Sequence, residues 1–173
     1  MNKTSLVYGL ITGLVILVSF FALSAFMGAP EELTPEKYRQ AEAVGQVRYL
    51  ILLVGIVMAM LSFRKQSAGS VTYRSAIGVG IQAALVIAVM VALMEGAFMA
   101  INPEFGEAAK DVYLQEMQDS GASADKIAAE TKKMDSMAWM MTPAGMGAFY
   151  LFETAVAGTL VALIAGIFVK RKG

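Results

Sequence analysis

Four long runs of apolar residues constrain the fold of this chain more than any other feature. Residues 6–26 include no charged side chain, and residues 76–101 and 144–169 include one carboxylate each. About 20 apolar residues in a helix are enough to cross the hydrocarbon core of a bilayer. The fourth run, residues 49–63, reaches that length when it is extended back to Ala43. This extension adds Gln46 and Arg48 at the headgroup level, where an arginine side chain can reach water.

The sequence therefore predicts an all-α, polytopic membrane protein with one domain over residues 1–173. Its four transmembrane helices are expected at about residues 6–26, 43–63, 76–101 and 144–169. Composition agrees, because only 16% of the residues are charged, against about 25% in an average globular chain. The bilayer is the first expected partner.

Composition also excludes several classes of function. The formal net charge is zero, whereas a nucleic-acid-binding surface needs an excess of basic residues. The chain has no Cys and no His, so it lacks thiol nucleophiles, imidazole bases and the usual zinc ligands. A methionine group at positions 134–146 offers soft ligands for Cu(I), but helix packing explains methionines equally well. We expect no catalytic residues, no metal, no cofactor and no enzymatic activity.

The first apolar run has a second interpretation. Lys3 precedes it and small residues follow it, as in a secretory signal peptide. The run is longer than the core of about 7–15 residues that is typical of such signals. Gly9 and Gly13 also form the GxxxG spacing that lets membrane helices approach closely. We interpret residues 6–26 as a transmembrane helix.

The distribution of Lys and Arg predicts the orientation. The first five residues, residues 64–74 and the last four residues together carry seven basic side chains and no acidic one. The opposite segments, residues 27–48 and 102–141, also carry seven basic side chains but twelve acidic ones. By the positive-inside rule, both termini and the middle loop are expected in the cytoplasm.

The long segment at residues 102–141 has a helical pattern with a break in the middle. Pro103 begins the first part, Ser120 and Gly121 interrupt it, and Ser123 is suited to cap a second helix. We therefore expect an extracytoplasmic helical hairpin between the third and fourth transmembrane helices.

Several segments together resemble a known family. They are YGLITGL in the first span, SVTYRSAIGVGIQAAL entering the third, INPEF after it, and DSGASADKIAAE in the outer loop. The chain resembles the bacterial four-helix membrane proteins catalogued as domain of unknown function 4199. The resemblance covers nearly the whole chain and implies a multi-pass protein of the bacterial inner membrane. It implies no activity and no functional residues.

Small residues at every fourth position predict which helix faces pack together. Membrane helices associate by close backbone approach and polar contacts, because burial of apolar surface gains little in lipid. Two ladders of small residues have this spacing, and we expect the third and fourth spans to pack along them. The ladder in the third span is Gly80, Ala84, Ala88, Ala92, Gly96 and Ala100, and that in the fourth is Thr154, Gly158, Ala162 and Gly166.

Two carboxylates inside the spans are the candidate functional residues. Glu95 precedes Gly96 of one ladder, and Glu153 precedes Thr154 of the other. If the ladders pack antiparallel, both acids flank the same side of the seam. An ionised carboxylate in hydrocarbon costs about 2.5–3.5 kcal/mol, so each acid needs a polar partner or water. Candidate partners are Arg48 and Gln82.

The two acids permit two interpretations. They could form a coupled pair that holds a proton and serves in a proton or cation relay, or they could tie helices together as structural contacts. We expect a non-enzymatic inner-membrane protein that acts by helix association, as a homo-oligomer or with a larger membrane partner. The alternative function is a small proton- or cation-coupled transporter or channel subunit.

Overall fold

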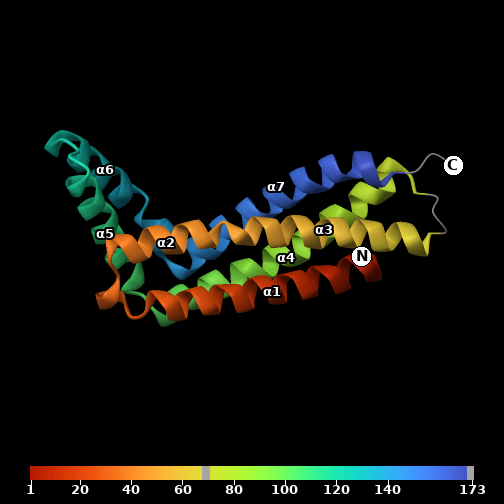
Figure 1. The fold of residues 1–173 in the computed structure, drawn as a ribbon, viewed down its shortest axis with the longest axis horizontal. Coiled ribbons are helices and arrows are strands. Elements are labelled where there is room, and N and C mark those ends of the chain that lie inside the picture. Colours follow the sequence, from red (N-terminus) through yellow and green to blue (C-terminus); the bar gives the residue numbers. More distant parts are fainter. Residues whose placement is uncertain (68–70, 171–173) are drawn as a thin grey trace.

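A computed structural model describes residues 1–67 and 71–170, and this part of the chain is helical with no strand. Four long helices dominate it: α1 (Lys3–Met27), α3 (Val47–Gln66), α4 (Tyr73–Ile101) and α7 (Pro143–Val169). Five shorter elements connect them (Figure 1). These are η1 (Pro30–Glu32), α2 (Pro35–Gly45), α5 (Phe105–Asp119), α6 (Ala124–Ser136) and η2 (Ala138–Met141).

Side-chain caps decide where most helices begin. Thr72 accepts a hydrogen bond from the backbone of Ser75, and Thr142 accepts one from Gly145, so α4 and α7 start slightly before the predicted spans. Ser123 caps α6 in the same way, as the sequence predicts. The second span is longer than expected, because α2 continues into α3 with only a break at Gln46.

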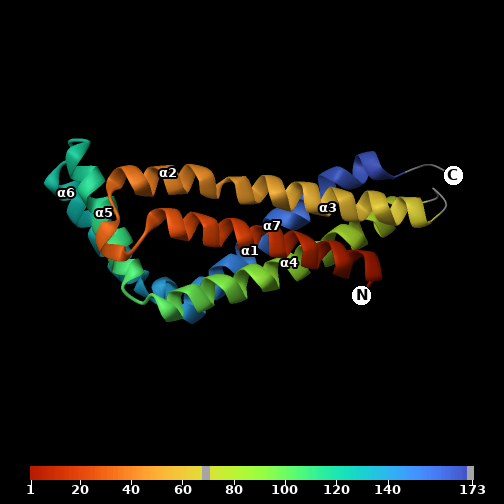
Figure 2. The ribbon, with the colours of Figure 1, turned by 60° about the horizontal axis from the view of Figure 1, so that its bottom comes forward.

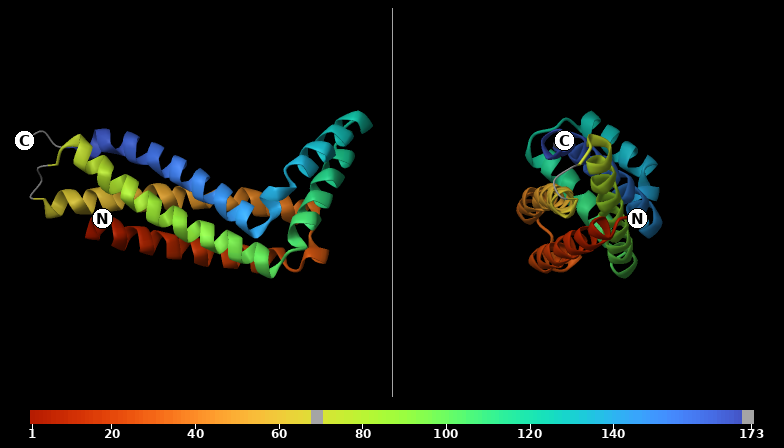
Figure 3. Two further views of the ribbon diagram at one scale, coloured as in Figure 1. Left: turned by 180° about the vertical axis from the view of Figure 1, so that it is seen from behind. Right: turned by 90° about the vertical axis from the view of Figure 1, so that its right-hand side faces the viewer.

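The long helices form one bundle around α4. This helix packs against α1, α3 and α7, most extensively against α7, while α1 and α7 lie apart (Figures 2 and 3). The start of α1 and the end of α7 lie at one end of the bundle, which we call the terminal end. The hairpin of α5 and α6 lies at the other, which we call the hairpin end. The prediction of a four-helix, all-α membrane protein with this hairpin is confirmed. Arg171 and Lys172, which were counted among the basic residues of the terminal segments, lie outside the described residues.

The predicted seam between the third and fourth spans is present. A Cβ atom built on Gly158 would lie 2.5 Å from the Cβ of Ala84, and one on Gly80 would lie 2.7 Å from the Cβ of Ala162. Such distances show that the two helices approach as closely as glycine allows. Towards the hairpin end, Gly96 approaches the backbone of α7 in the same way, whereas Ala100 at the end of the ladder is exposed.

The glycine pair in α1 also packs against α4. A Cβ on Gly9 would lie 2.7 Å from the Cβ of Val86, and one on Gly13 would overlap the sulfur of Met90. These glycines bring α1 onto the face of α4 that α7 does not occupy. The GxxxG interpretation of the first span agrees with this packing.

The exterior of the long helices is apolar. Leu93 is 69% exposed, Phe152 72% and Phe168 76%, and many other large apolar side chains of these helices are exposed as well. In water such a surface would aggregate, whereas in a bilayer it contacts acyl chains. All four spans are long and apolar enough to cross a membrane, so the architecture is that of an integral membrane protein.

Candidate functional site

Arg48 joins three helices at one point inside the bundle. It lies in the first turn of α3, directly after the break at Gln46. Its Nη2 atom lies 3.1 Å from Oε2 of Glu153 on α7, and its Nη1 atom lies 4.0 Å from Oε1 of Glu95 on α4. One planar guanidinium therefore faces both carboxylates that the sequence analysis singled out.

Two tyrosines complete the cluster. Arg48 Nη2 donates a hydrogen bond of 2.8 Å to the hydroxyl of Tyr49, which in turn donates to Oε1 of Glu153. The guanidinium carbon also lies 4.8 Å from the ring centre of Tyr49 and 4.6 Å from that of Tyr150. Cation–π contacts of this kind stabilise a guanidinium that has lost part of its hydration. We call Arg48, Tyr49, Glu95, Tyr150 and Glu153 the charge cluster.

The two carboxylates differ in their surroundings. Glu153 accepts hydrogen bonds from Arg48 and from Tyr49, and its side chain is 23% exposed. The side chain of Glu95 is only 10% exposed, and its contact with Arg48 at 4.0 Å is too long for a hydrogen bond. Within the described residues Glu95 has no hydrogen-bond partner. The arrangement thus supplies Glu153 with two hydrogen-bond donors and leaves Glu95 weakly compensated.

The cluster lies in the half of the bundle nearer the hairpin. Glu95 is six residues before the end of α4 at Ile101, and Glu153 is ten residues after the start of α7 at Pro143. At a helical rise of about 1.5 Å per residue, these positions are about 9 and 15 Å inside the helix ends. Both acids are therefore well within the length of helix that crosses a bilayer core.

A small cavity adjoins the cluster in the middle of the bundle. All four long helices line it, through Ile16 of α1, Arg48, Tyr49 and Leu52 of α3, Val91 of α4 and Thr154 of α7. The space that the centre of a water molecule can occupy is about 10 Å³, which is close to the minimum for one water. Polar groups of Arg48, Tyr49 and Thr154 are available to such a water.

The sequence suggested two polar partners for the acids, and the structure brings only one of them to the cluster. Arg48 faces both carboxylates. Gln82 lies towards the terminal end, where its side-chain oxygen accepts a hydrogen bond of 2.7 Å from the backbone of Asn2. It contacts neither carboxylate in the described structure, because it lies thirteen positions from Glu95 along α4, which is about 20 Å.

Tyr49 and Tyr150 were not among the candidate residues inferred from the sequence, although both belong to the cluster. A local signal for both was present. Tyr49 directly follows Arg48, and Tyr150 precedes Glu153 by three residues, a spacing that puts two side chains on the same face of a helix.

Comparison with known proteins gives a family but no activity. The model of a family described as "Protein of unknown function (DUF4199)" matches residues 7–171, which is nearly the whole chain. No curated protein and no solved structure matches the chain at a significant level.

Proposed function

Because the chain belongs to the DUF4199 family, whose description includes no activity, we propose a function from the charge cluster itself. The protein is a transporter or channel subunit coupled to protons or monovalent cations, with Glu95 and Glu153 as the binding groups. One observation carries this proposal: two carboxylates share a single guanidinium inside the membrane-spanning bundle.

The free-energy cost of the cluster supports a functional role. Each charged group costs about 2.5–3.5 kcal/mol at the centre of a membrane helix on insertion scales. Neutral residues of similar size could join α3 to α7 without that cost, and replacing a buried ion pair by apolar residues is often stabilising. Ionisable groups at such depth are characteristic of ion and proton pathways.

We further propose that the protein lies in the inner membrane of a bacterium with both termini in the cytoplasm. Arg64, Lys65, Arg74 and Lys170 lie at or near the terminal end of the long helices. The acidic segments of the hairpin and of α2 lie at the opposite end. Such a charge distribution supports an orientation with the terminal end in the cytoplasm.

The test is ion flux in proteoliposomes. Proton and monovalent-cation flux should be measured for the wild type, Glu95→Gln and Glu153→Gln, with Glu107→Gln as a matched control. Glu107 is 78% exposed in the hairpin and belongs to no cluster in the membrane. We expect flux in the wild type and the control and its loss in both cluster variants. Equal flux in all four proteins, or none in the wild type, would contradict the proposal.

Helix association is the second candidate function, and a groove on the lipid-facing surface favours it. This groove lies between α1 and α4, has a volume of about 480 Å³, and is lined by apolar side chains such as Leu17, Phe21 and Leu93. A helix of another membrane protein could fill it by van der Waals packing. Leu93→Trp should then weaken association measured by native mass spectrometry from lipid nanodiscs, whereas Leu160→Trp on the exposed face of α7 should not.

A further inference from the structure

We propose that Glu95 binds a single proton, which reaches it from the hairpin end of the bundle. This inference rests on the proposed function and deepens it, because it names the ion, the acceptor and the side of access. Four features of the described structure carry it: the charge balance, the surroundings of Glu95, the size of the cavity and the packing on its two sides.

The first feature is the balance of charge. Arg48 supplies one positive charge, and Glu95 and Glu153 together supply two negative charges when both are ionised. Neither tyrosine adds a positive charge, and α1 has no charged side chain in its buried part, since Lys3 lies at the terminal end. The cluster becomes neutral when one acid takes up a proton, and neutrality is strongly favoured where the surroundings are apolar.

The second feature identifies the acid that takes up the proton. Glu153 receives hydrogen bonds from Arg48 and Tyr49, which stabilise its anion. Glu95 is nine-tenths buried, receives no hydrogen bond in the described structure, and lies 4.0 Å from the guanidinium. A hydronium ion delivers the proton to a carboxylate oxygen of Glu95 and leaves as water. The product is a neutral carboxylic acid beside the Arg48–Glu153 ion pair.

The third feature limits the ligand. The cavity beside Arg48 and Tyr49 provides about 10 Å³ for the centre of a water molecule. One water fits, and it could carry a proton to the cluster, but an organic cation or a hydrated metal ion does not. The space beside Arg48 and Tyr49 therefore excludes organic and hydrated cations. The infrared band described below distinguishes a proton from a dehydrated monovalent cation.

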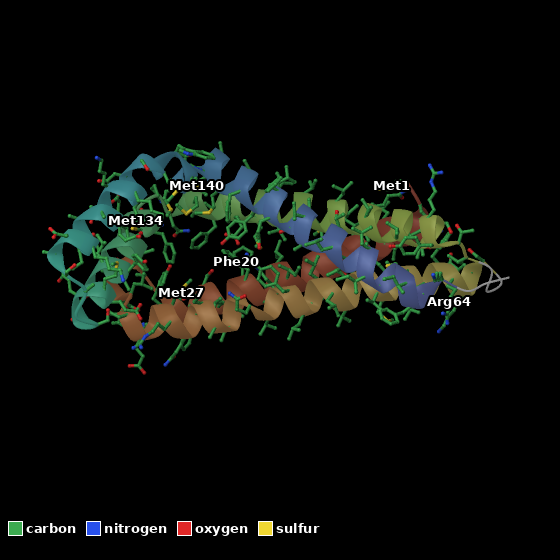
Figure 4. All side chains as sticks on the ribbon, turned by 90° about the horizontal axis from the view of Figure 1, so that it is seen from above. Met1, Phe20, Met27, Arg64, Met134 and Met140 are labelled. Atoms are coloured by element: carbon green, nitrogen blue, oxygen red, sulfur yellow. The ribbon has the colours of Figure 1, made fainter. Side chains whose placement is uncertain are left out.

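The fourth feature decides the side of access. The large apolar side chains that are fully buried, Ile56, Met60 and Ile87, all lie between the cluster and the terminal end. On the hairpin side the apolar side chains are buried less completely, since Met99 is 3% exposed and Leu33 9% exposed. Arg48 and Glu153 remain about one quarter exposed. Figure 4 shows Met27 and Met134 towards the hairpin end and Arg64 towards the terminal end, with Phe20 between them. The acidic hairpin end also attracts cations.

Infrared difference spectroscopy of the protein in lipid tests proton binding directly, without any need for transport. A carboxylic acid has a carbonyl band that a carboxylate lacks, so a pH titration shows whether a buried acid is protonated. We expect a band in the wild type and in the control Glu107→Gln, and its loss in Glu95→Gln. Persistence of the band in Glu95→Gln would overturn the assignment of the acceptor.

A second variant tests the charge balance. In Glu153→Gln, one guanidinium faces one carboxylate, so Glu95 no longer needs a proton for neutrality. We expect its affinity for protons to fall about 10-fold or more, seen as a titration midpoint at lower pH. An unchanged or higher midpoint would show that the two acids are not coupled through Arg48.

Side-specific pH changes test the direction of access. Vesicles that contain the protein in one orientation are needed, and because the chain has no Cys, the single variant Asp125→Cys marks the hairpin side for a membrane-impermeant thiol reagent. We expect the Glu95 band to follow the pH on the hairpin side and not the pH on the terminal side. A response to the terminal side, or to both sides at the same rate, would overturn the proposed access.

The spectroscopic and flux experiments separate this inference from the proposed function. A protonated Glu95 without any ion flux would contradict transport and leave the proton site standing. Ion flux without a protonated Glu95 would support transport and contradict the proton site at Glu95. Absence of both would contradict the two proposals together.

Discussion

Arg48 faces two acids with two different nitrogen atoms of one planar group. Nη1 points towards Glu95 on α4 and Nη2 towards Glu153 on α7, while the plane contacts the rings of Tyr49 and Tyr150. A lysine ammonium is a point charge and cannot reproduce this geometry. The polar contact of α3 with α4 and α7 therefore depends on an arginine at this position.

Removal of the guanidinium should destabilise the protein. In Arg48→Leu both carboxylates lose their counterion, and we expect unfolding to become easier by about 2–3 kcal/mol, since partial exposure of the site reduces the cost of a buried pair. The measurement is the midpoint of thermal unfolding in detergent. The triple variant Arg48→Leu, Glu95→Gln, Glu153→Gln should recover most of the loss, because it leaves no buried charge. A triple variant as unstable as Arg48→Leu would contradict this explanation.

Lys110 gives a prediction for pH dependence outside the membrane. Its ammonium donates a hydrogen bond of 2.7 Å to Asp135, which joins α5 to α6 and raises the pKa of the lysine above its ordinary value. A raised pKa in the folded state means that the contact contributes fully at pH values below the pKa of an unfolded lysine, about 10.4. The contribution is lost as the pH rises through the raised pKa.

The titration of Lys110 followed by NMR checks this prediction. In Asp135→Asn the midpoint should fall towards that of an ordinary lysine, because the acceptor loses its charge. Asp125→Asn, at the opposite end of α6 and outside this contact, should leave the midpoint unchanged. A shift of equal size in both variants would mean that the general charge of the hairpin, and not this hydrogen bond, sets the pKa.

At the scale of helices, the seam between α4 and α7 depends on the absence of side chains. Gly80 meets the Cβ of Ala162 and the sulfur of Met60, so an added methyl group has no room there. Gly78 belongs to the same helix and faces open space, with no atom within 4 Å of an added Cβ. Alanine substitutions at these two glycines therefore separate the effect of close packing from the effect of helix propensity.

Alanine at the two positions should have opposite effects. Gly80→Ala should reduce the free energy of unfolding by about 1–3 kcal/mol because it overpacks the seam. Gly78→Ala should have no cost and could gain up to about 1 kcal/mol, because alanine favours helix more than glycine does. Thermal unfolding of both variants under the same conditions measures the difference. Equal losses would show that the seam is not tightly packed in the native protein.

Much of this element-level organisation could be predicted from the sequence. Small residues at every fourth position identified both faces of the seam, and the cap Ser123 marked where α6 begins. The continuation of α2 into α3 was missed, because the polar residues of α2 lie beyond the apolar run that defines the span. Hydropathy reports the part of a helix inside the membrane and does not report where the helix ends.

For the whole molecule, the two ends of the bundle should lie on opposite sides of the membrane. The absence of native Cys allows a single introduced thiol to report its side. In intact cells a membrane-impermeant thiol reagent should label Asp125→Cys in the hairpin and should not label Lys65→Cys at the terminal end. Permeabilised cells should show labelling of both. The reverse pattern in intact cells would contradict the orientation expected from the basic residues.

The sequence alone determined the number of spans, the hairpin and the faces of the seam, because each depends on a local property: the length of an apolar run, a helix cap, or a repeat of small residues. Which residues meet in the charge cluster depended on the tertiary structure. Residue 48 lies 47 positions from Glu95 and 105 from Glu153, so their contact follows from how α3 is rotated and placed against α4 and α7. No local pattern encodes that rotation, and it alone decided that Arg48 meets both acids. Gln82 is kept from Glu95 by its distance of thirteen positions along α4.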